Sequence, residues 1–180
     1  MYNLEEEAIH YVFISFKGKK RMKEDIDKVF HSIMVGIMLK NIGCNEKICL
    51  SGYLHDIIED TEGTYEVLKE KFGLRIADNV KILSENKEIK DWKERKVEFI
   101  NRIIKENNDI LLIELADKLQ NLISDYNLFL KLGKECLKTE SNSYENVKWF
   151  YLRLKDIFNE RLENNQLLER YNQICNIYFE

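Results

Sequence analysis

The chain has 180 residues, of which 44% are hydrophobic and 33% are charged, and its formal net charge is −4. This length suits one domain with a sizeable buried core, while the acidic balance argues against a protein that coats a nucleic-acid polymer. No apolar run reaches the roughly 18 residues of a membrane span, and the acidic segment 1–10 is unlike a signal peptide. We therefore expect a globular, cytoplasmic protein.

Helical periodicity dominates the sequence. Proline is absent and glycine occurs seven times, and apolar residues recur at spacings of three and four, which is the period of an amphipathic helix. The pattern predicts an all-α fold, with residues 1–180 forming a single domain, a helical bundle of about eight or nine helices. In chain order we expect helices at residues 4–16, 26–42, 45–59, 64–72, 74–84, 91–103 and 110–132, and two more within 144–179.

Short polar residues mark several expected helix starts. Asn45, Thr64, Asp91 and Asp109 each precede an apolar periodic segment, where a side-chain oxygen can accept a hydrogen bond from a free backbone N–H of the first turn. Gly133 is expected to end the long helix that Asp109 begins. These residues therefore predict where the helices begin and end.

The sharpest local signal is a group of ionisable residues inside the apolar run at 54–60. His55, Asp56, Glu59 and Asp60 fall within six residues, and on a helix they would form one polar band. Burying unpaired charge is costly, so such groups must pair, stay hydrated or bind a cation. A histidine nitrogen with a carboxylate oxygen suits Mn²⁺, Fe²⁺ or Zn²⁺.

Two further residues are unexpected in a simple helical core. Asp117 interrupts the apolar segment 110–123 and forms a polar stripe with Asn121 and Ser124, at i+4 and i+7. His31 lies within the apolar segment 29–34. Polar stripes of this kind commonly line a cleft or meet a buried ion.

Each of these residues also has a purely structural interpretation. A histidine on an apolar helix face is usually satisfied by a hydrogen bond, Asp117 could pair with Lys118 or Arg21, and the Glu-Asp pair could cap the loop that follows it. The joint pattern favours metal ligation, because His31 is followed 24 residues later by His-Asp and 61 residues beyond that by Asp117. Four side chains of matching chemistry then come from three separate helices.

This order of histidine, histidine-aspartate and aspartate resembles the signature of the HD superfamily of metal-dependent phosphohydrolases. Residues 55–61, HDIIEDT, are similar to the HDxxED motif of the RelA/SpoT hydrolase domain and of the small alarmone hydrolases. Residues 114–122, ELADKLQNL, resemble the LADxxxNL motif, and residues 18–21, GKKR, resemble the G-x-x-R that precedes the first histidine. The segment IDKVF at 26–30 departs from the family, which has Pro-Tyr before that histidine.

The resemblance implies a role for each candidate residue. The implied ligands of a divalent ion, Mn²⁺ in this family, are His31, His55, Asp56 and Asp117. The residues implied to order and deprotonate the attacking water are Glu59 and Asp60. The implied substrate contacts are Arg21, Lys20, Lys23, Asn121 and Tyr151; the last stands for the tyrosine of an Arg-x-x-x-Tyr motif whose arginine has no match here.

The implied reaction removes the 3′-pyrophosphate from guanosine tetra- or pentaphosphate, giving GDP or GTP. Two alternatives stay open: an HD-type nucleotidase or pyrophosphatase that acts on another nucleotide, and a non-catalytic helical module that binds a nucleotide or a protein. The expected partner is a nucleotide, with neither a nucleic-acid polymer nor a membrane involved. A surface helix at 144–162 could pair two copies into an oligomer.

Overall fold

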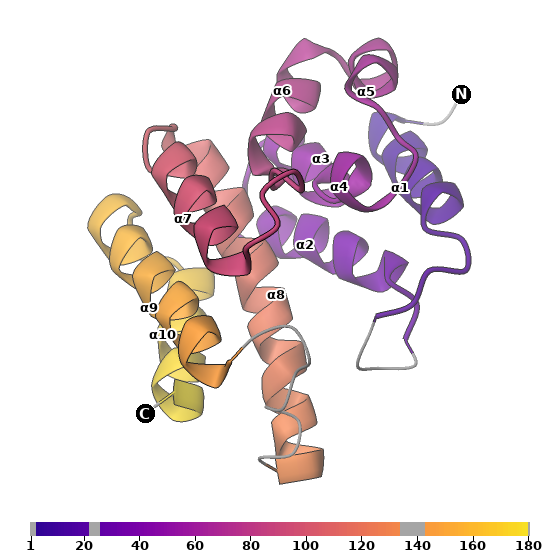
Figure 1. The fold of residues 1–180 in the computed structure, drawn as a ribbon. Coiled ribbons are helices and arrows are strands. Elements are labelled where there is room, and N and C mark those ends of the chain that lie inside the picture. Colours follow the sequence, from indigo (N-terminus) through magenta and orange to yellow (C-terminus); the bar gives the residue numbers. More distant parts are fainter. Residues whose placement is uncertain (1–2, 22–25, 134–142, 180) are drawn as a thin grey trace. The chain divides into compact units, whose positions relative to one another are not determined.

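A computed structural model of the chain describes residues 3–21, 26–133 and 143–179. These residues form ten α-helices, and their only β feature is an isolated antiparallel bridge between Lys20 and Asp27 (Figure 1). The prediction of an all-α fold is therefore confirmed. The chain divides into two compact units, Met1–Ser84 and Glu85–Glu180. That both belong to one functional domain stays a prediction.

Six helices build the first unit. Helix α2 packs against α3, α1 contacts both, and α6 packs against α3, α4 and α5. Fully buried apolar side chains from all six helices fill the core between them. The helices are α1 (Leu4–Ser15), α2 (Val29–Asn41), α3 (Glu46–Leu54), α4 (Ile57–Asp60), α5 (Tyr65–Phe72) and α6 (Leu74–Leu83).

Two glycines bring α2 and α3 into close contact. A Cβ atom at Gly36 would lie 2.2 Å from the ring of Tyr53, and one at Gly52 would lie 2.5 Å from Cδ1 of Leu39. The same Cβ at Gly52 would lie only 3.3 Å from the Cα of Gly36. A side chain at Gly36 would overlap the Tyr53 ring, and one at Gly52 would displace the end of Leu39 and press on the Gly36 main chain, so the two glycines allow the helices to approach closely.

Four helices build the second unit. The long helix α8 packs against α9 and α10, and α7 packs against α9. Aromatic rings fill much of this core, and the Tyr171 hydroxyl donates a 3.0 Å hydrogen bond to the carbonyl oxygen of Tyr151. The helices are α7 (Trp92–Ile103), α8 (Asn108–Leu132), α9 (Tyr144–Arg161) and α10 (Gln166–Phe179).

Most of the predicted helix ends are confirmed. The side chains of Asn45, Thr64 and Asp91 accept hydrogen bonds from backbone N–H groups in the first turns of α3, α5 and α7. The predicted start of α8 is wrong, because Asn107 is its cap and accepts bonds from the N–H groups of residues 109 and 110. Asp109 instead places its charge in the first turn, where the helix dipole favours an anion.

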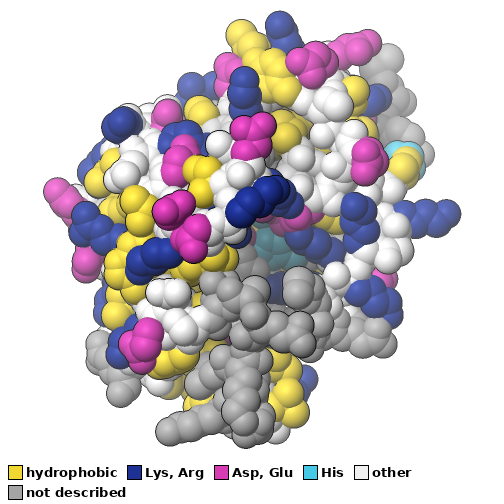
Figure 2. Space-filling view, in the orientation of Figure 1, with side chains coloured by type: hydrophobic (Ala, Val, Ile, Leu, Met, Phe, Trp, Pro, Cys, Tyr) yellow, Lys and Arg dark blue, Asp and Glu magenta, His cyan; other side chains and the backbone are white. Residues whose placement is uncertain are grey.

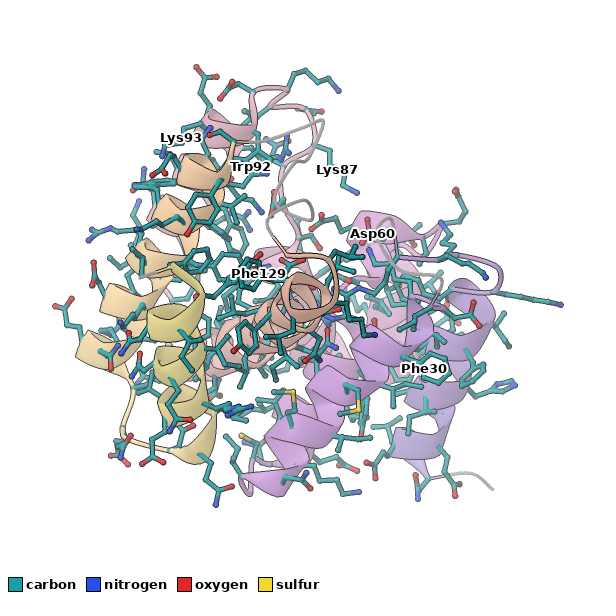
Figure 3. All side chains as sticks on the ribbon, turned by 90° about the horizontal axis from the view of Figure 1, so that it is seen from below. Phe30, Asp60, Lys87, Trp92, Lys93 and Phe129 are labelled. Carbon is teal, nitrogen blue, oxygen red and sulfur yellow. The ribbon has the colours of Figure 1, made fainter. Side chains whose placement is uncertain are left out.

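Both signs of charge are interspersed over the face drawn in Figure 2, with hydrophobic side chains between them. Within the described residues, no helix combines the length and hydropathy that a membrane span requires. Helix α2 leaves two apolar side chains exposed, Phe30 (labelled in Figure 3) and Met34.

Candidate metal centre

A break in the helix shapes the His-Asp motif. The sequence predicted one helix over residues 45–59, but α3 ends at Leu54 and α4 begins at Ile57. Asp56 lies between them with φ −89° and ψ 0°, whereas neighbouring residues of a continuous helix project about 100° apart. Through the break, Oδ1 of Asp56 comes within 3.3 Å of Nε2 of His55. Because of this break, the described residues form ten helices where the sequence predicted about eight or nine.

Two buried histidines face each other in the first unit. His31 on α2 and His55 at the end of α3 are each 4% exposed, and their Nε2 atoms are 3.1 Å apart. Nδ1 of His55 lies 2.7 Å from the carbonyl oxygen of Gly52. Since a carbonyl only accepts, Nδ1 of His55 carries a proton, and in the neutral imidazole Nε2 is then the nitrogen with the lone pair. This is the arrangement in which a histidine binds a metal.

The spacing of these atoms fits a small divalent ion. Two nitrogens that each lie about 2.1 Å from one ion would be about 3.0 Å apart at a right angle and about 3.4 Å apart at the tetrahedral angle. The observed separation of 3.1 Å falls within this range. Asp56 adds an anionic oxygen, with Oδ2 3.7 Å from Nε2 of His31. Two imidazoles and a carboxylate are a donor set that first-row divalent metals prefer.

A lysine that the sequence analysis missed lies beside these donors. Nζ of Lys28 is 3.6 Å from Oδ2 of Asp56 and donates a hydrogen bond to Oδ2 of Asp60. Burial lowers the pKa of Lys28, but the carboxylates of Asp56 and Asp60 outweigh it, so this pKa is raised. The available signal was its spacing, because Lys28 precedes His31 by three residues and hence lies on the same side of α2.

The basic loop before α2, which contains Lys19 and Arg21, is connected to Asp60 by a hydrogen bond. The backbone N–H of Arg21 donates to the carbonyl oxygen of Ile26, and that of Lys28 donates to Lys19. Nζ of Lys19 donates a 2.6 Å hydrogen bond to the carbonyl oxygen of Asp60, the residue labelled in Figure 3. The cationic segment therefore lies next to Asp60.

Of three further residues that the sequence analysis assigned to the site, the structure describes two. Lys20 is exposed and Glu59 is half-buried. Lys23 lies outside the described residues.

In the second unit, Asp117 is buried on α8 with both carboxylate oxygens engaged. Nζ of Lys118 donates to Oδ2 at 2.6 Å, and Nδ2 of Asn121 donates to Oδ1 at 2.7 Å. The pairing with Lys118, one of the structural interpretations, is therefore observed. Burial opposes the charge of Lys118, but Asp117 and Glu114 raise its pKa well above the usual range. Asp117 is thus held in one orientation by two donors.

Further charged groups lie buried in the second unit, and the sequence analysis did not predict them. Oε1 of Glu114 is 3.4 Å from Nζ of Lys118, and no described residue donates a hydrogen bond to this oxygen. Burial raises the pKa of Glu114 to about 7. Lys96 and Arg95 both pair with Glu85, and burial lowers the pKa of Lys96.

Tyr151 lies in the aromatic core of the second unit. Its ring centroid is 5.6 Å from that of Phe179 and 6.3 Å from that of Tyr171. Burial raises the pKa of the Tyr151 hydroxyl well above the usual range. Its observed surroundings are thus those of a packing residue, and its predicted contact with substrate stays a prediction.

Comparison with known proteins adds an independent finding. The HD domain family matches residues 8–127, from α1 into α8. The chain is 31% identical over 108 residues to a guanosine-3′,5′-bis(diphosphate) 3′-pyrophosphohydrolase of Aquifex aeolicus. It is 30% identical over 115 residues to the enzyme of that name, MESH1, of Drosophila melanogaster. These alignments cover 58% and 61% of this chain, and 15% and 64% of the two relatives.

Solved structures show the same fold. A metazoan orthologue of SpoT, described as hydrolysing ppGpp, aligns with a TM-score of 0.80 at 22% identity, covering 98% of this chain and 96% of that one. An HD domain implies a bound divalent metal ion, and the donors of the first unit fit one. The match at residues 8–127 covers more than half of this chain. The chain therefore belongs to the HD domain family.

Proposed function

We propose that the chain is a metal-dependent phosphohydrolase that removes the 3′-pyrophosphate of guanosine tetra- or pentaphosphate in the cytoplasm. The observation that carries this proposal is the donor cluster of the buried His31 and His55 with the half-buried Asp56, and with Asp60 one turn further on. The names of the two relatives, both guanosine-3′,5′-bis(diphosphate) 3′-pyrophosphohydrolases, support the choice of substrate.

Asp117 is the fourth metal ligand in this proposal, and Mn²⁺ is the ion. Two facts support Asp117: the HD domain match extends into α8, past residue 117, and this buried carboxylate accepts a 2.6 Å hydrogen bond from the ammonium of Lys118. Either of its oxygens would exchange one hydrogen bond for a metal bond.

The chemistry then divides between the ion and the residues beside it. A bound divalent ion lowers the pKa of a water molecule and offsets the charge of the phosphate. Glu59 and Asp60 follow the donor cluster in α4, where a carboxylate can accept the proton of the attacking water. The cationic segment containing Lys20, Arg21 and Lys23 binds phosphate oxygens, because guanidinium and ammonium groups pair with them. We assign Asn121 and Tyr151 to the nucleoside part.

The test is hydrolysis of a nucleotide panel with Mn²⁺, with products separated by chromatography and pyrophosphate measured directly. We expect turnover of guanosine tetraphosphate and none of GMP or AMP. Asp56→Ala should lose Mn²⁺ binding in calorimetry and all hydrolysis, while its far-ultraviolet circular dichroism stays helical. The matched control is Asp78→Asn, which changes an aspartate of α6 that accepts a hydrogen bond from Tyr65.

The outcomes separate the alternatives. Turnover of another nucleotide, with guanosine tetraphosphate left intact, would favour an HD-type nucleotidase, an outcome that the departure at residues 26–30 makes worth testing. If the protein does not bind Mn²⁺ and does not hydrolyse any nucleotide, it is a non-catalytic module. Full activity in Asp56→Ala would overturn the ligand assignment.

A further inference from the structure

The ammonium of Lys28 lies between two carboxylates of the proposed metal centre. It donates to Oδ2 of Asp60 and lies 3.6 Å from Oδ2 of Asp56. All three side chains are at most about one quarter exposed, at 26%, 22% and 16%. Lys28 is thus a built part of the site rather than a surface side chain that passes near it.

The backbone and the ammonium group of Lys28 each make a further contact. Its N–H donates a 2.8 Å hydrogen bond to the carbonyl oxygen of Lys19, and its Nζ lies 5.9 Å from the centroid of the Phe16 ring. The position therefore does not depend on the carboxylates alone.

The same cation affects Asp56 and Asp60 in different ways. An ammonium that holds Asp60 fixes the direction of that carboxylate, one turn after Asp56. The same positive charge beside Asp56 repels a divalent cation that binds there, since like charges a few ångströms apart interact strongly in a partly buried site. Removing the charge of Lys28 should therefore leave Asp60 less well oriented and, at the same time, raise the affinity of the site for the ion.

We propose that Lys28 is a positioning residue that orients Asp60 for the reaction and weakens the binding of the divalent ion at Asp56. This inference rests on the proposed function and adds a residue that none of the resembling motifs contains. Lys28 belongs to the segment 26–30, where the chain departs from the family pattern. In this proposal, the unusual segment 26–30 therefore supplies a residue that acts on the metal site.

The test uses Lys28→Met, which keeps an unbranched stem, and Lys28→Arg, which keeps the charge. The matched control is Lys40→Met, which removes an exposed lysine of α2, the helix that follows Lys28; Lys40 pairs with Glu5 at 2.7 Å. Titration calorimetry with Mn²⁺, without nucleotide, measures the Kd of the ion. Steady-state kinetics with guanosine tetraphosphate at saturating Mn²⁺ then separates kcat from KM.

We expect Lys28→Met to bind Mn²⁺ about tenfold more tightly, the order that removal of one nearby charge gives. We also expect its kcat to fall at least about tenfold with KM changed less than about threefold, because an unfixed Asp60 affects the reaction more than binding. Lys28→Arg should keep the wild-type Kd within about threefold, and Lys40→Met should match the wild type in both measurements.

Equal or weaker Mn²⁺ binding by Lys28→Met would overturn the inference, since a merely structural lysine would lower thermal stability and metal affinity together. An unchanged kcat would overturn the role in orienting Asp60. A different result would overturn the proposed function, namely wild-type protein that does not hydrolyse guanosine tetraphosphate. In that case the Mn²⁺ titration would still show whether Lys28 weakens binding of the ion. Wild-type protein that binds no Mn²⁺ would overturn both.

Discussion

Replacing Glu114 with glutamine should make the protein more stable at neutral pH and leave it unchanged in acid. Glu114 is 1% exposed, and burial raises its pKa to about 7 from an ordinary 4.5. The folded state therefore holds a proton that the unfolded state releases between these two values, so stability falls as the pH rises through this window. At 1.36 kcal/mol per pKa unit, the loss above pH 7 is about 3 kcal/mol.

Glutamine resembles the protonated carboxyl and does not titrate, so Glu114→Gln should avoid this loss. The assay is urea unfolding at pH 5, 6, 7 and 8 with a chelator present, followed by tryptophan fluorescence. Both tryptophans of the chain, Trp92 and Trp149, lie in the second unit with Glu114, and Figure 3 labels Trp92 on α7. Fluorescence therefore reports on the unit that contains the mutation.

The gain in unfolding free energy of Glu114→Gln over wild type should grow from about 0.8 kcal/mol at pH 5 to about 3 kcal/mol at pH 8. Glu160→Gln, at an exposed position of α9, controls for the loss of one negative charge from the same unit. A gain that is the same at pH 5 and pH 8 would refute the reasoning, because it would show that Glu114 does not titrate between these values.

Three other predictions concern packing, capping and the ion. Gly36→Ala should destabilise the first unit by about 2 kcal/mol or more in thermal unfolding, because its Cβ would overlap the Tyr53 ring; a smaller loss would mean that α2 and α3 separate easily. Asn107→Ala should cost about 1 kcal/mol in urea unfolding through loss of the α8 cap, whereas Asn107→Asp should cost little. Mn²⁺ at one hundred times its Kd should raise the unfolding free energy by about 2.7 kcal/mol, and a similar rise in Asp56→Ala would contradict the ligand set.

The sequence predicted those features that local chemistry decides. The caps at Asn45 and Thr64 follow from one side chain and the next three residues, and Gly73 and Gly133 end their helices with the positive φ that glycine permits. The cap of α8 was misplaced by two residues, because Asn107 and Asp109 are both good caps and sequence alone does not rank them. The family was predicted correctly, since its motifs consist of short, well-spaced residues.

Features that depend on distant segments were not predicted. The break between His55 and Asp56 leaves the apolar periodicity of residues 45–59 intact, so the pattern indicated one helix. The pairing of Glu85 with Lys96 joins residues on two sides of a turn, and neither residue is unusual in the sequence. Lys28 was not predicted to belong to the site, because its partner Asp60 is 32 residues away in the sequence.

The close contact at Gly36 and Gly52 also bears on the two histidines. His31 projects from α2 and His55 from the end of α3, the two helices that meet at these glycines, and their Nε2 atoms are 3.1 Å apart. Gly52 has a second role, because its carbonyl oxygen lies 2.7 Å from Nδ1 of His55. One closely packed stretch of α3 therefore both orients the imidazole of His55 and brings it near that of His31.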